Sequence, residues 1–464
     1  MAYSVKLCVF HRYTFATKIN MLNYTKLAAI YGCLLGSATW SIAQENPGNT
    51  PLSLSLQQVW QKSDQYSKVI QMERLQVKRS KEAIRDAETE RLPELSVGGN
   101  FEQATNIPIY EKGLLHKPTQ HEVIHTLYKI GADGYLNIYN GSKTNLKIAE
   151  EEVKDKIAIE QQNRSISDIR YKAAARYLEL QRSLIFKELM IKDIADQEKQ
   201  LQEIRHFLKN GVVLKSDVLR VELKLSRQKL SLVTIQNDIA LSNQKLNILI
   251  GQPDDQVVVP TDPTSPETVE AETYEGYLSQ AMDHSFQFHI SEQETQLKKI
   301  ELKTVKANVS LKIGLYGDFY YANPQIFLYP YNPHLYSLGI AGIRASFPIS
   351  AFYLNRHKEK MAELDLKRQE IEHADTEDLV RKQVKEAYLR YKEALIGVDV
   401  AKVNVEQARE NARIVNNTYF NQSSLVTDLL DANVQLLQTR FDLASAEMAA
   451  RLQYFQLQNV IGNL

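Results

Sequence analysis

The sequence has few residues that interrupt helices, and long stretches lack them altogether. Its 13 prolines leave long proline-free runs, such as Thr119 to Gln252 and Ile349 to Leu464. Between Ser142 and Ile250 the only glycine is Gly211. A helix interior excludes proline because the ring removes a hydrogen-bond donor and clashes with the preceding turn. The sequence therefore permits helices such as 142–206, about 100 Å long at ~1.5 Å per residue, which is longer than a globular domain.

Cysteine, excess charge of one sign and long apolar runs are also lacking. The 56 basic and 56 acidic residues balance, which does not suggest a nucleic-acid partner. Both cysteines, Cys8 and Cys33, lie near the N-terminus, so the rest of the chain needs no disulfide framework. Past the N-terminal region, no stretch approaches the ~18 apolar residues of a membrane helix. If this chain enters a membrane, we expect it to do so as strands.

The N-terminal region has the pattern of a secretory signal. Lys26 precedes an apolar stretch that runs to Trp40, and Ser41-Ile42-Ala43 has small residues at the positions that signal peptidase prefers. We expect residues 1–43 to be removed, with Met21 as the true start. Cys33 follows a weak likeness of a lipoprotein box, but Tyr31 is bulky for that box, so a plain signal-sequence cysteine is favoured over lipidation.

The remainder of the chain is an internal duplication. Lys215 to Gly251 aligns without a gap on Val426 to Gly462, at a constant offset of 211 residues. Aligned pairs include Asp217 with Asp428, and Ile250 with Ile461. We therefore predict two structural repeats, 44–252 and 273–464, joined by a proline-rich linker at 253–272.

Each repeat is expected to contain one helix, a strand pair and a long helical hairpin. The predicted helices are 52–90, 142–206 and 217–250 in the first repeat, and 273–306, 351–417 and 425–461 in the second. Ser216 is the expected N-cap of its helix, next to Asp217, which suits the positive helix end. The hairpin tips are expected at 207–211 and 419–424, the second two residues shorter if Phe207 and Phe420 are equivalent.

Alternating residues predict four strands, at 95–104, 127–140, 309–322 and 336–348. In the third, Leu311, Ile313 and Leu315 alternate with polar or small residues, which is typical of a barrel strand with lipid on one face and water on the other. Four strands cannot close a barrel, and open edges are not stable in lipid. Several copies must then share one barrel. The predicted fold class is mainly α with a small β-barrel contribution, homotrimeric, with long antiparallel hairpins.

Other readings of the same residues stay open at this point. Helical periodicity alone favours a bundle, and a periplasmic coiled-coil adaptor or scaffold also carries a long hairpin. His116, His121 and His125 lie in a loop between two predicted strands, where a solvated loop is favoured over a metal site. No phosphate loop, nucleophile elbow or paired-carboxylate cleft is visible, so no enzyme activity, cofactor or metal is expected.

Taken together, the residues resemble the TolC-type outer-membrane efflux channels over essentially the whole mature chain. The matching features are the duplicated hairpins, Arg91-Leu92-Pro93-Glu94-Leu95 before the first strand, and Leu136-Asn137-Ile138-Tyr139-Asn140-Gly141 after the second. The resemblance implies a homotrimer in the outer membrane with a periplasmic helical tunnel. It also implies docking to a periplasmic adaptor (membrane fusion protein), which links the channel to an inner-membrane pump of RND, ABC or MFS type, or to a type I secretion system.

The resemblance further implies an entrance constriction at the second tip. Two acidic residues in the first turn of the last helix would be Asp428 and Asp431, and Tyr419 matches an aromatic residue that helps to hold the closed state. Ser424 stands where well-known members carry a basic residue, so we expect a different closing network here. For Asp428 an ordinary helix-start role is an equal alternative, whereas Asp431 has Arg220 as its counterpart, which favours an entrance role.

The hairpin tips are the expected docking surface for the adaptor. They lie farthest from the membrane in this architecture, and apolar residues there need a partner or each other. The residues concerned are Leu208, Gly211, Val212, Val213, Phe420 and Gln422.

Overall fold

The computed structural model describes residues 51–263, 272–324 and 332–464. Residues 51–464 form one compact unit. The expected signal segment 1–43, with Met21 and Cys33, lies outside the described residues, as does most of the second half of the expected linker 253–272. Among the described residues, no helix combines the length and the apolar character that crossing a membrane requires.

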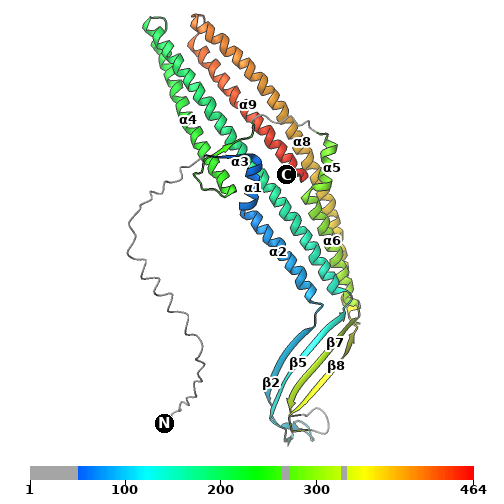
Figure 1. Ribbon diagram of the computed structural model, residues 1–464. Coiled ribbons are helices and arrows are strands. Elements are labelled where there is room, and N and C mark those ends of the chain that lie inside the picture. Colours follow the sequence, from blue (N-terminus) through cyan, green and yellow to red (C-terminus); the bar gives the residue numbers. More distant parts are fainter. Residues whose placement is uncertain (1–50, 264–271, 325–331) are drawn as a thin grey trace, which may run out of the picture. The chain divides into compact units, whose positions relative to one another are not determined.

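Long helices dominate the fold (Figure 1). The helices of the first half are α1 (Leu56–Tyr66), α2 (Lys68–Thr89), α3 (Lys143–Lys209) and α4 (Lys215–Ile250). The helices of the second half are α5 (Tyr274–His284), α6 (Phe286–Lys306), the single turn α7 (Ala351–Leu354), α8 (Arg356–Phe420) and α9 (Val426–Ile461). The helices α3 and α8 contain 67 and 65 residues, which the absence of proline permits, and α8 continues through its one glycine, Gly397.

The first helix of each half is interrupted, which the sequence analysis missed. The predicted helices 52–90 and 273–306 break at Ser67 and Ser285, each after a helix of 11 residues. Both serines have extended ψ angles, and the Ser67 hydroxyl accepts the amide of Ile70 at 3.4 Å, which starts α2. Residues 52–54 are not helical either, because strand β1 (Leu52–Leu54) pairs in parallel with β6 (Val258–Pro260).

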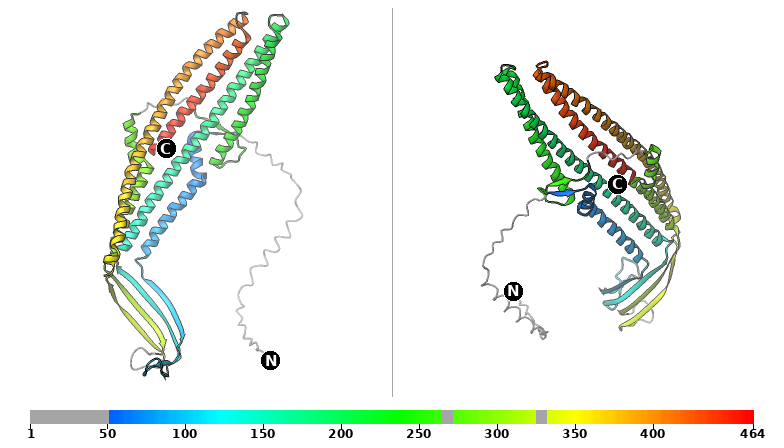
Figure 2. Two further views of the ribbon diagram at one scale, coloured as in Figure 1. Left: turned by 180° about the vertical axis from the view of Figure 1, so that it is seen from behind. Right: turned by 45° about the horizontal axis from the view of Figure 1, so that its top comes forward.

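Four strands form an antiparallel sheet at the end of the helices opposite the hairpin tips (Figures 1 and 2). They are β2 (Glu94–Gln103), β5 (Thr126–Tyr139), β7 (Lys312–Asn323) and β8 (Tyr336–Ser346), in the order β2-β5-β7-β8. A small hairpin, β3 (Ile107–Ile109) with β4 (Thr119–His121), extends the β2–β5 connection. The predicted strand 309–322 begins too early, because Ala307–Val309 form a 3₁₀ turn.

The register gives the sheet one polar and one apolar face. Asp133 lies opposite Asp318 on the polar face, and Ala132 lies opposite Phe319 on the apolar face. In the sequence, Leu338 and Ile340 alternate with Ser337, Gly339 and Ala341, which predicts that both lie on the apolar face, and this prediction is wrong. They pair with Tyr320 and Asp318 and so share the polar face. Beyond Gly342 the apolar residues change face, and Ile343 pairs with Leu315.

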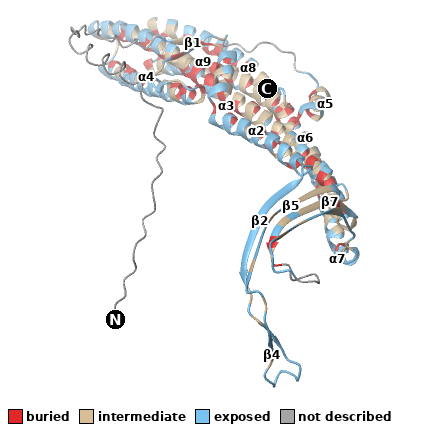
Figure 3. Cartoon of the chain, turned by 60° about the horizontal axis from the view of Figure 1, so that its bottom comes forward, coloured by how far each residue is buried: buried red, intermediate tan, exposed pale blue. Residues whose placement is uncertain are grey.

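The two helical hairpins lie side by side, and α3 contacts α9 between them. Toward the tips the lateral order is α4, α3, α9, α8, and nearer the sheet it is α2, α3, α6, α8 (Figure 1). One outer edge is therefore α4 and α2, and the other is α8. Buried side chains concentrate along the contacts between helices, whereas the strands are mostly exposed (Figure 3). The chain by itself therefore leaves both its sheet and its outer helices uncovered.

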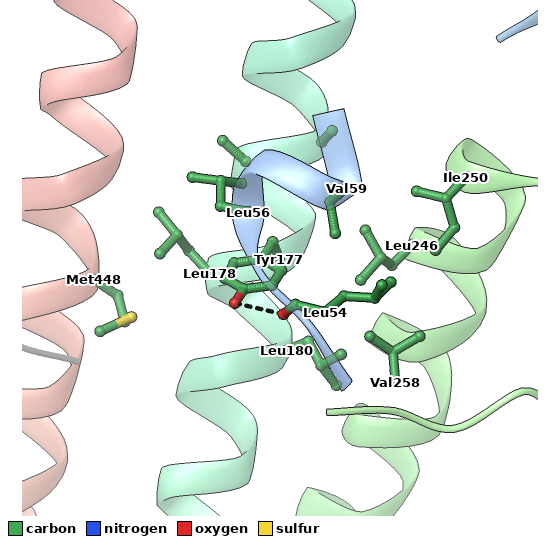
Figure 4. Packing of buried hydrophobic residues seen from close by; sticks show 12 residues of the cluster. Leu54, Leu56, Val59, Tyr177, Leu178, Leu180, Leu246, Ile250, Val258 and Met448 are labelled. Atoms are coloured by element: carbon green, nitrogen blue, oxygen red, sulfur yellow. Dashed lines mark hydrogen bonds between the residues drawn. The ribbon is translucent and has the colours of Figure 1, made fainter. Parts of the chain in front are cut away.

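A tyrosine holds the strand pair β1–β6 against the helices. The Tyr177 hydroxyl donates to the carbonyl oxygen of Leu54 at 3.0 Å and accepts the amides of Thr261 and Asp262 (Figure 4). Burial raises the pKa of Tyr177 to about 12. Around it pack apolar side chains from α1, α4 and α9, including Val59, Leu246 and Met448. This cluster fixes the middle of the hairpins, from which both tips extend.

Candidate channel entrance and hairpin tips

The two hairpin turns have the same backbone geometry. Each comprises five residues, 210–214 and 421–425, between helices that end and begin 211 residues apart. Gly211 and Gln422 take the left-handed conformation, with φ of 75° and 63°. The amide of Val212 donates to Phe207 at 2.9 Å, and that of Ser423 donates to Thr418 at 2.8 Å, a helix-terminating pattern. The expectation of a shorter second tip is wrong, because Phe207 is equivalent to Thr418 and not to Phe420.

Asp217 and Asp428 both cap the helix that follows the turn. The Asp217 carboxylate accepts the amide of Leu214 at 3.2 Å, and the Asp428 carboxylate accepts the amide of Leu425 at 3.1 Å. These bonds satisfy amides that the helix leaves unpaired. Ser216 is therefore not the N-cap, and the cap position belongs to Leu214. Asp428 has a structural task whether or not it also has a functional one.

Tyr419 lies in the apolar core that joins the two hairpins near their tips. Its side chain is 6% exposed and packs with residues of α3, α4 and α9 such as Ile204, Val221 and Leu429. Its hydroxyl is buried and has no hydrogen-bond partner among the described residues. Burial raises the pKa of Tyr419, and the negative charge of Asp217 raises it further. Tyr419 thus ties the second hairpin to the first within one chain.

Several expected docking residues are instead packed at the contact between the tips. Phe420 lies 5.9 Å from Phe207 and 5.3 Å from Tyr419, measured between ring centroids. Leu208 and Val213 pack against the same core, which matches the alternative that these residues contact one another. Val212 remains 40% exposed.

The most exposed apolar residues of the tips were missed by the sequence analysis. Leu214 and Leu425 are 70% and 69% exposed. They are equivalent under the 211-residue offset, and that repetition was the signal that could have found them. Each turn therefore presents one leucine to solvent at the position before its helix.

Ser424 and Asp431 have different surroundings. The Ser424 hydroxyl accepts a hydrogen bond from the Thr418 hydroxyl at 3.2 Å, within the turn. Asp431 is exposed one turn into α9, three residues after Asp428. Close to it, Lys224 of α4 reaches across the hairpins and donates to the carbonyl oxygen of Leu430 at 2.7 Å.

Lys224, Asp193 and Gln228 form a partly buried polar cluster that the sequence analysis did not predict. Burial lowers the pKa of Lys224, which the charges of Asp193 and Asp431 oppose. Burial also raises the pKa of Asp193, whose carboxylate accepts a hydrogen bond from Gln228. Lys224 thus places an amine near Asp431, one of the two acids expected at the entrance.

The histidines of the β2–β5 connection show no arrangement for metal binding. His125 Nδ1 lies 2.8 Å from the carbonyl oxygen of Ala104. Within the described ranges, no group of three or more histidine, cysteine, aspartate or glutamate side chains could hold a metal ion.

Comparison with known proteins identifies the fold. No protein-family model matches the sequence, and no curated protein matches it. Solved structures do match: the outer membrane protein VceC from Vibrio cholerae has 16% identity and a TM-score of 0.70, over 88% of this chain and 96% of VceC. The open state of the Neisseria gonorrhoeae MtrE outer membrane channel has 14% identity and a TM-score of 0.69, over 88% of each chain. CusC, a transmembrane channel, has 13% identity and a TM-score of 0.74, over 88% of this chain and 92% of CusC.

The chain therefore has the fold of the TolC-type outer-membrane channels. This confirms the fold class expected from the sequence, with long helical hairpins and a four-stranded antiparallel sheet.

Proposed function

We propose that this protein is the trimeric outer-membrane channel of a tripartite efflux or type I secretion system. It conducts small molecules or exported substrates from a periplasmic pump–adaptor complex to the exterior. The helices extend into the periplasm, and transport through such a duct involves no enzymatic step. The observation that carries the proposal is that both lateral edges of the chain, in the helices and in the sheet, are apolar or unpaired.

The outer helices α4 and α8 carry the uncovered apolar side chains. On α4 these are Leu219, Leu223, Leu230, Val233, Leu241 and Ile248. On α8 they are Met361, Leu364, Ile371, Leu389, Ile396, Val400, Val403 and Ile414. Many are seven residues apart, such as Leu223 and Leu230, which is the spacing of a packed helical seam. Because α4 and α2 form one edge and α8 forms the other, α4 and α2 of one copy can pack on α8 of the next, and the copies close into a ring.

The sheet supports the same closure. Strands β2 and β8 are its edges, and their outward backbone groups have no ladder partner in the part of the chain that the structure describes. In lipid those groups must be paired, so β8 of one copy is expected to pair with β2 of the next. Three copies supply twelve strands, with the apolar face of Val97 and Phe319 toward lipid and the polar face of Asp133 and Asp318 toward the lumen.

The hairpin tips would dock the periplasmic adaptor, through which the inner-membrane pump connects. Leu214, Leu425 and Val212 are exposed apolar groups there, and Gly211 and Gln422 form the two turns. Asp428 and Asp431 are exposed at the start of α9, where three copies would bring six carboxylates around the axis. This arrangement supports an acidic entrance that favours cations.

Native mass spectrometry of the detergent-purified protein tests the proposal, together with membrane fractionation. We expect a trimer in the outer-membrane fraction. A charged residue in the helical seam, Leu230→Lys or Leu389→Lys, should dissociate it, because each leucine loses about 1.5–3 kcal/mol of burial. Ile191→Lys, at a comparably exposed position on α3, should leave the trimer intact. A stable folded monomer, or soluble or inner-membrane material, would instead support the adaptor or scaffold alternative.

A further inference from the structure

The connection between β8 and α8 exposes an unusual density of large apolar side chains. Five of the eight residues in Phe347–Leu354, which we call the neck segment, are apolar or aromatic and 49% to 74% exposed. They are Phe347, Ile349, Phe352, Tyr353 and Leu354. The segment includes the single turn of α7, at the junction of sheet and helices (Figure 3).

This exposure is not fraying, because the residue that follows is fixed. Asn355 is buried, donates to the carbonyl oxygen of Val305 at 2.8 Å and accepts from the Asn308 side chain at 2.9 Å. The amides of Phe352 and Leu354 are bonded within the turn. The sequence analysis expected one continuous helix over 351–417, and Asn355 is where it breaks. The fold thus holds the neck segment outward.

The neck segment continues the apolar face of the sheet. In β8, Ile343 and Ala345 share that face, since they pair with Leu315 and Ile313, and Phe347 is next in the same alternation. Three cationic or titratable side chains follow, Arg356, His357 and Lys358, which are exposed. No ion pair within the described residues involves any of them. Aromatic and apolar side chains followed by cations are typical of segments that lie at a membrane surface.

The equivalent junction in the first half has no such segment. Between β5 and α3 the chain turns through Asn140, Gly141 and Ser142, and a Cβ atom on Gly141 would lie 2.3 Å from Ser310. This junction is closed by contact of Gly141 with the second half. Its connecting residues are small or polar, so the apolar connection of the neck segment is not a general feature of the architecture.

We propose that the neck segment is an interfacial anchor that inserts Phe352 and its apolar neighbours into the phospholipid leaflet, while Arg356 and Lys358 bind anionic headgroups. This inference rests on the proposed function, because it requires the sheet to span the membrane. The lipid surface is the occupant that accounts for the cations as well as the apolar residues. A neighbouring copy would be reached through the edge of β8 rather than through its apolar face.

The test uses the full-length assembled protein in vesicles of phosphatidylcholine and phosphatidylglycerol with brominated acyl chains, which quench nearby tryptophan. Phe352→Trp reports on the neck segment, Phe319→Trp on the apolar face of the sheet, and Tyr66→Trp on an exposed site of α1. We expect quenching and a blue shift for the first two variants and neither for the third. Native Trp60, partly buried on α1, gives a constant background.

Each result separates the two claims. If Phe319→Trp is quenched and Phe352→Trp is not, the anchor is wrong while the membrane channel stands. Emission from Phe352→Trp that is blue-shifted but unquenched places the segment on another copy of the chain and also overturns the anchor. If neither tryptophan is quenched, the proposed function itself fails.

A second set of variants tests whether Arg356 and Lys358 bind anionic headgroups. In the Phe352→Trp background, Arg356→Gln with Lys358→Gln should reduce quenching in vesicles that contain phosphatidylglycerol. Lys360→Gln is the matched control, because Lys360 is exposed but already paired with Glu363 at 3.1 Å. Equal quenching in all three proteins would overturn the headgroup assignment.

Discussion

Gly211 and Gln422, one in each hairpin turn, share the left-handed backbone conformation 211 residues apart. Glycine adopts it without strain, whereas a side chain costs roughly 1–2 kcal/mol there. A Cβ atom on Gly211 would have no heavy atom within 4 Å, so Gly211→Ala adds only this backbone cost. We expect that variant to weaken the first turn and Gln422→Gly to strengthen the second.

Hydrogen exchange of two amides measures both effects. The Val212 amide should exchange about five- to thirtyfold faster in Gly211→Ala, and the Ser423 amide correspondingly slower in Gln422→Gly. In each variant the unchanged turn is the internal control. If the Val212 amide exchanges at the same rate in Gly211→Ala as in the wild type, the turn opens without a change in the φ angle of residue 211, and the prediction is wrong.

The sequence could predict the hairpins but not the interactions that complete them. Residues without proline and with regular apolar spacing predict α3 and α8, because helix periodicity is a local property. The break at Asn355 was not visible, since it depends on contacts with Val305 and Asn308 from a distant part of the chain. Lys224 was missed for the same reason, as its acceptor lies on α9.

The strand faces show a similar limit. Alternation predicts that a strand has two faces, but only the register says which face is shared with the neighbouring strand. The sequence pattern predicts Leu338 and Ile340 on the apolar face, but they pair with Tyr320 and Asp318 on the polar face.

Tyr419→Phe is expected to maintain or raise stability near neutral pH. The Tyr419 hydroxyl is buried without a partner, and removing such a group recovers up to about 1–3 kcal/mol. Burial and the charge of Asp217 raise the pKa of Tyr419 in the folded chain, which disfavours its ionised form. The free energy of unfolding of the wild type is therefore unaffected by this group below its ordinary pKa of 10.0, and it falls as the pH rises from there through the raised pKa. The variant should lack this alkaline loss.

Hydrogen exchange of α8 amides near residue 419, compared between pH 8 and pH 11, tests this at the tip. Tyr177→Phe is the contrasting variant, because that hydroxyl makes three hydrogen bonds and its loss should be destabilising. If Tyr419→Phe destabilises the tips at pH 8, the hydroxyl has a partner in the assembled channel.

Leu214 and Leu425 are expected to contact the adaptor. Replacing both with Ser leaves the backbone amides that Asp217 and Asp428 accept, so the turns should persist. A photoreactive residue at Lys209 or Gln422 should then crosslink less adaptor than in the wild-type background, with the trimer unchanged. Ile191→Ser is the control, because Ile191 is an exposed apolar residue of α3 away from the tips and outside the helical seam. Crosslinks confined to the channel itself, with the adaptor co-expressed, would reject docking at the tips.

The last prediction concerns the entrance acids. If Asp428 and Asp431 form a ring of six carboxylates in the trimer, their potential favours cations and binds multivalent cations strongly enough to impede current. Replacing both with Ala should therefore lower cation selectivity and relieve block by Mg²⁺ or hexaamminecobalt in planar bilayers. A helix-start role alone predicts only a stability loss of about 0.3–1 kcal/mol per residue.

Asp217→Ala separates these roles, because it removes the same capping bond from the other hairpin. It should cost similar stability and leave selectivity unchanged if the ring lies at the start of α9. If the double Asp428 and Asp431 variant has the selectivity and block of the wild type, with the trimer intact, Asp428 has only its capping role and Asp431 is an ordinary exposed acid. If Asp217→Ala and the double variant relieve block equally, acidic charge from both hairpins lies at the entrance. In the first hairpin, Arg220 would then offset part of the charge of Asp217.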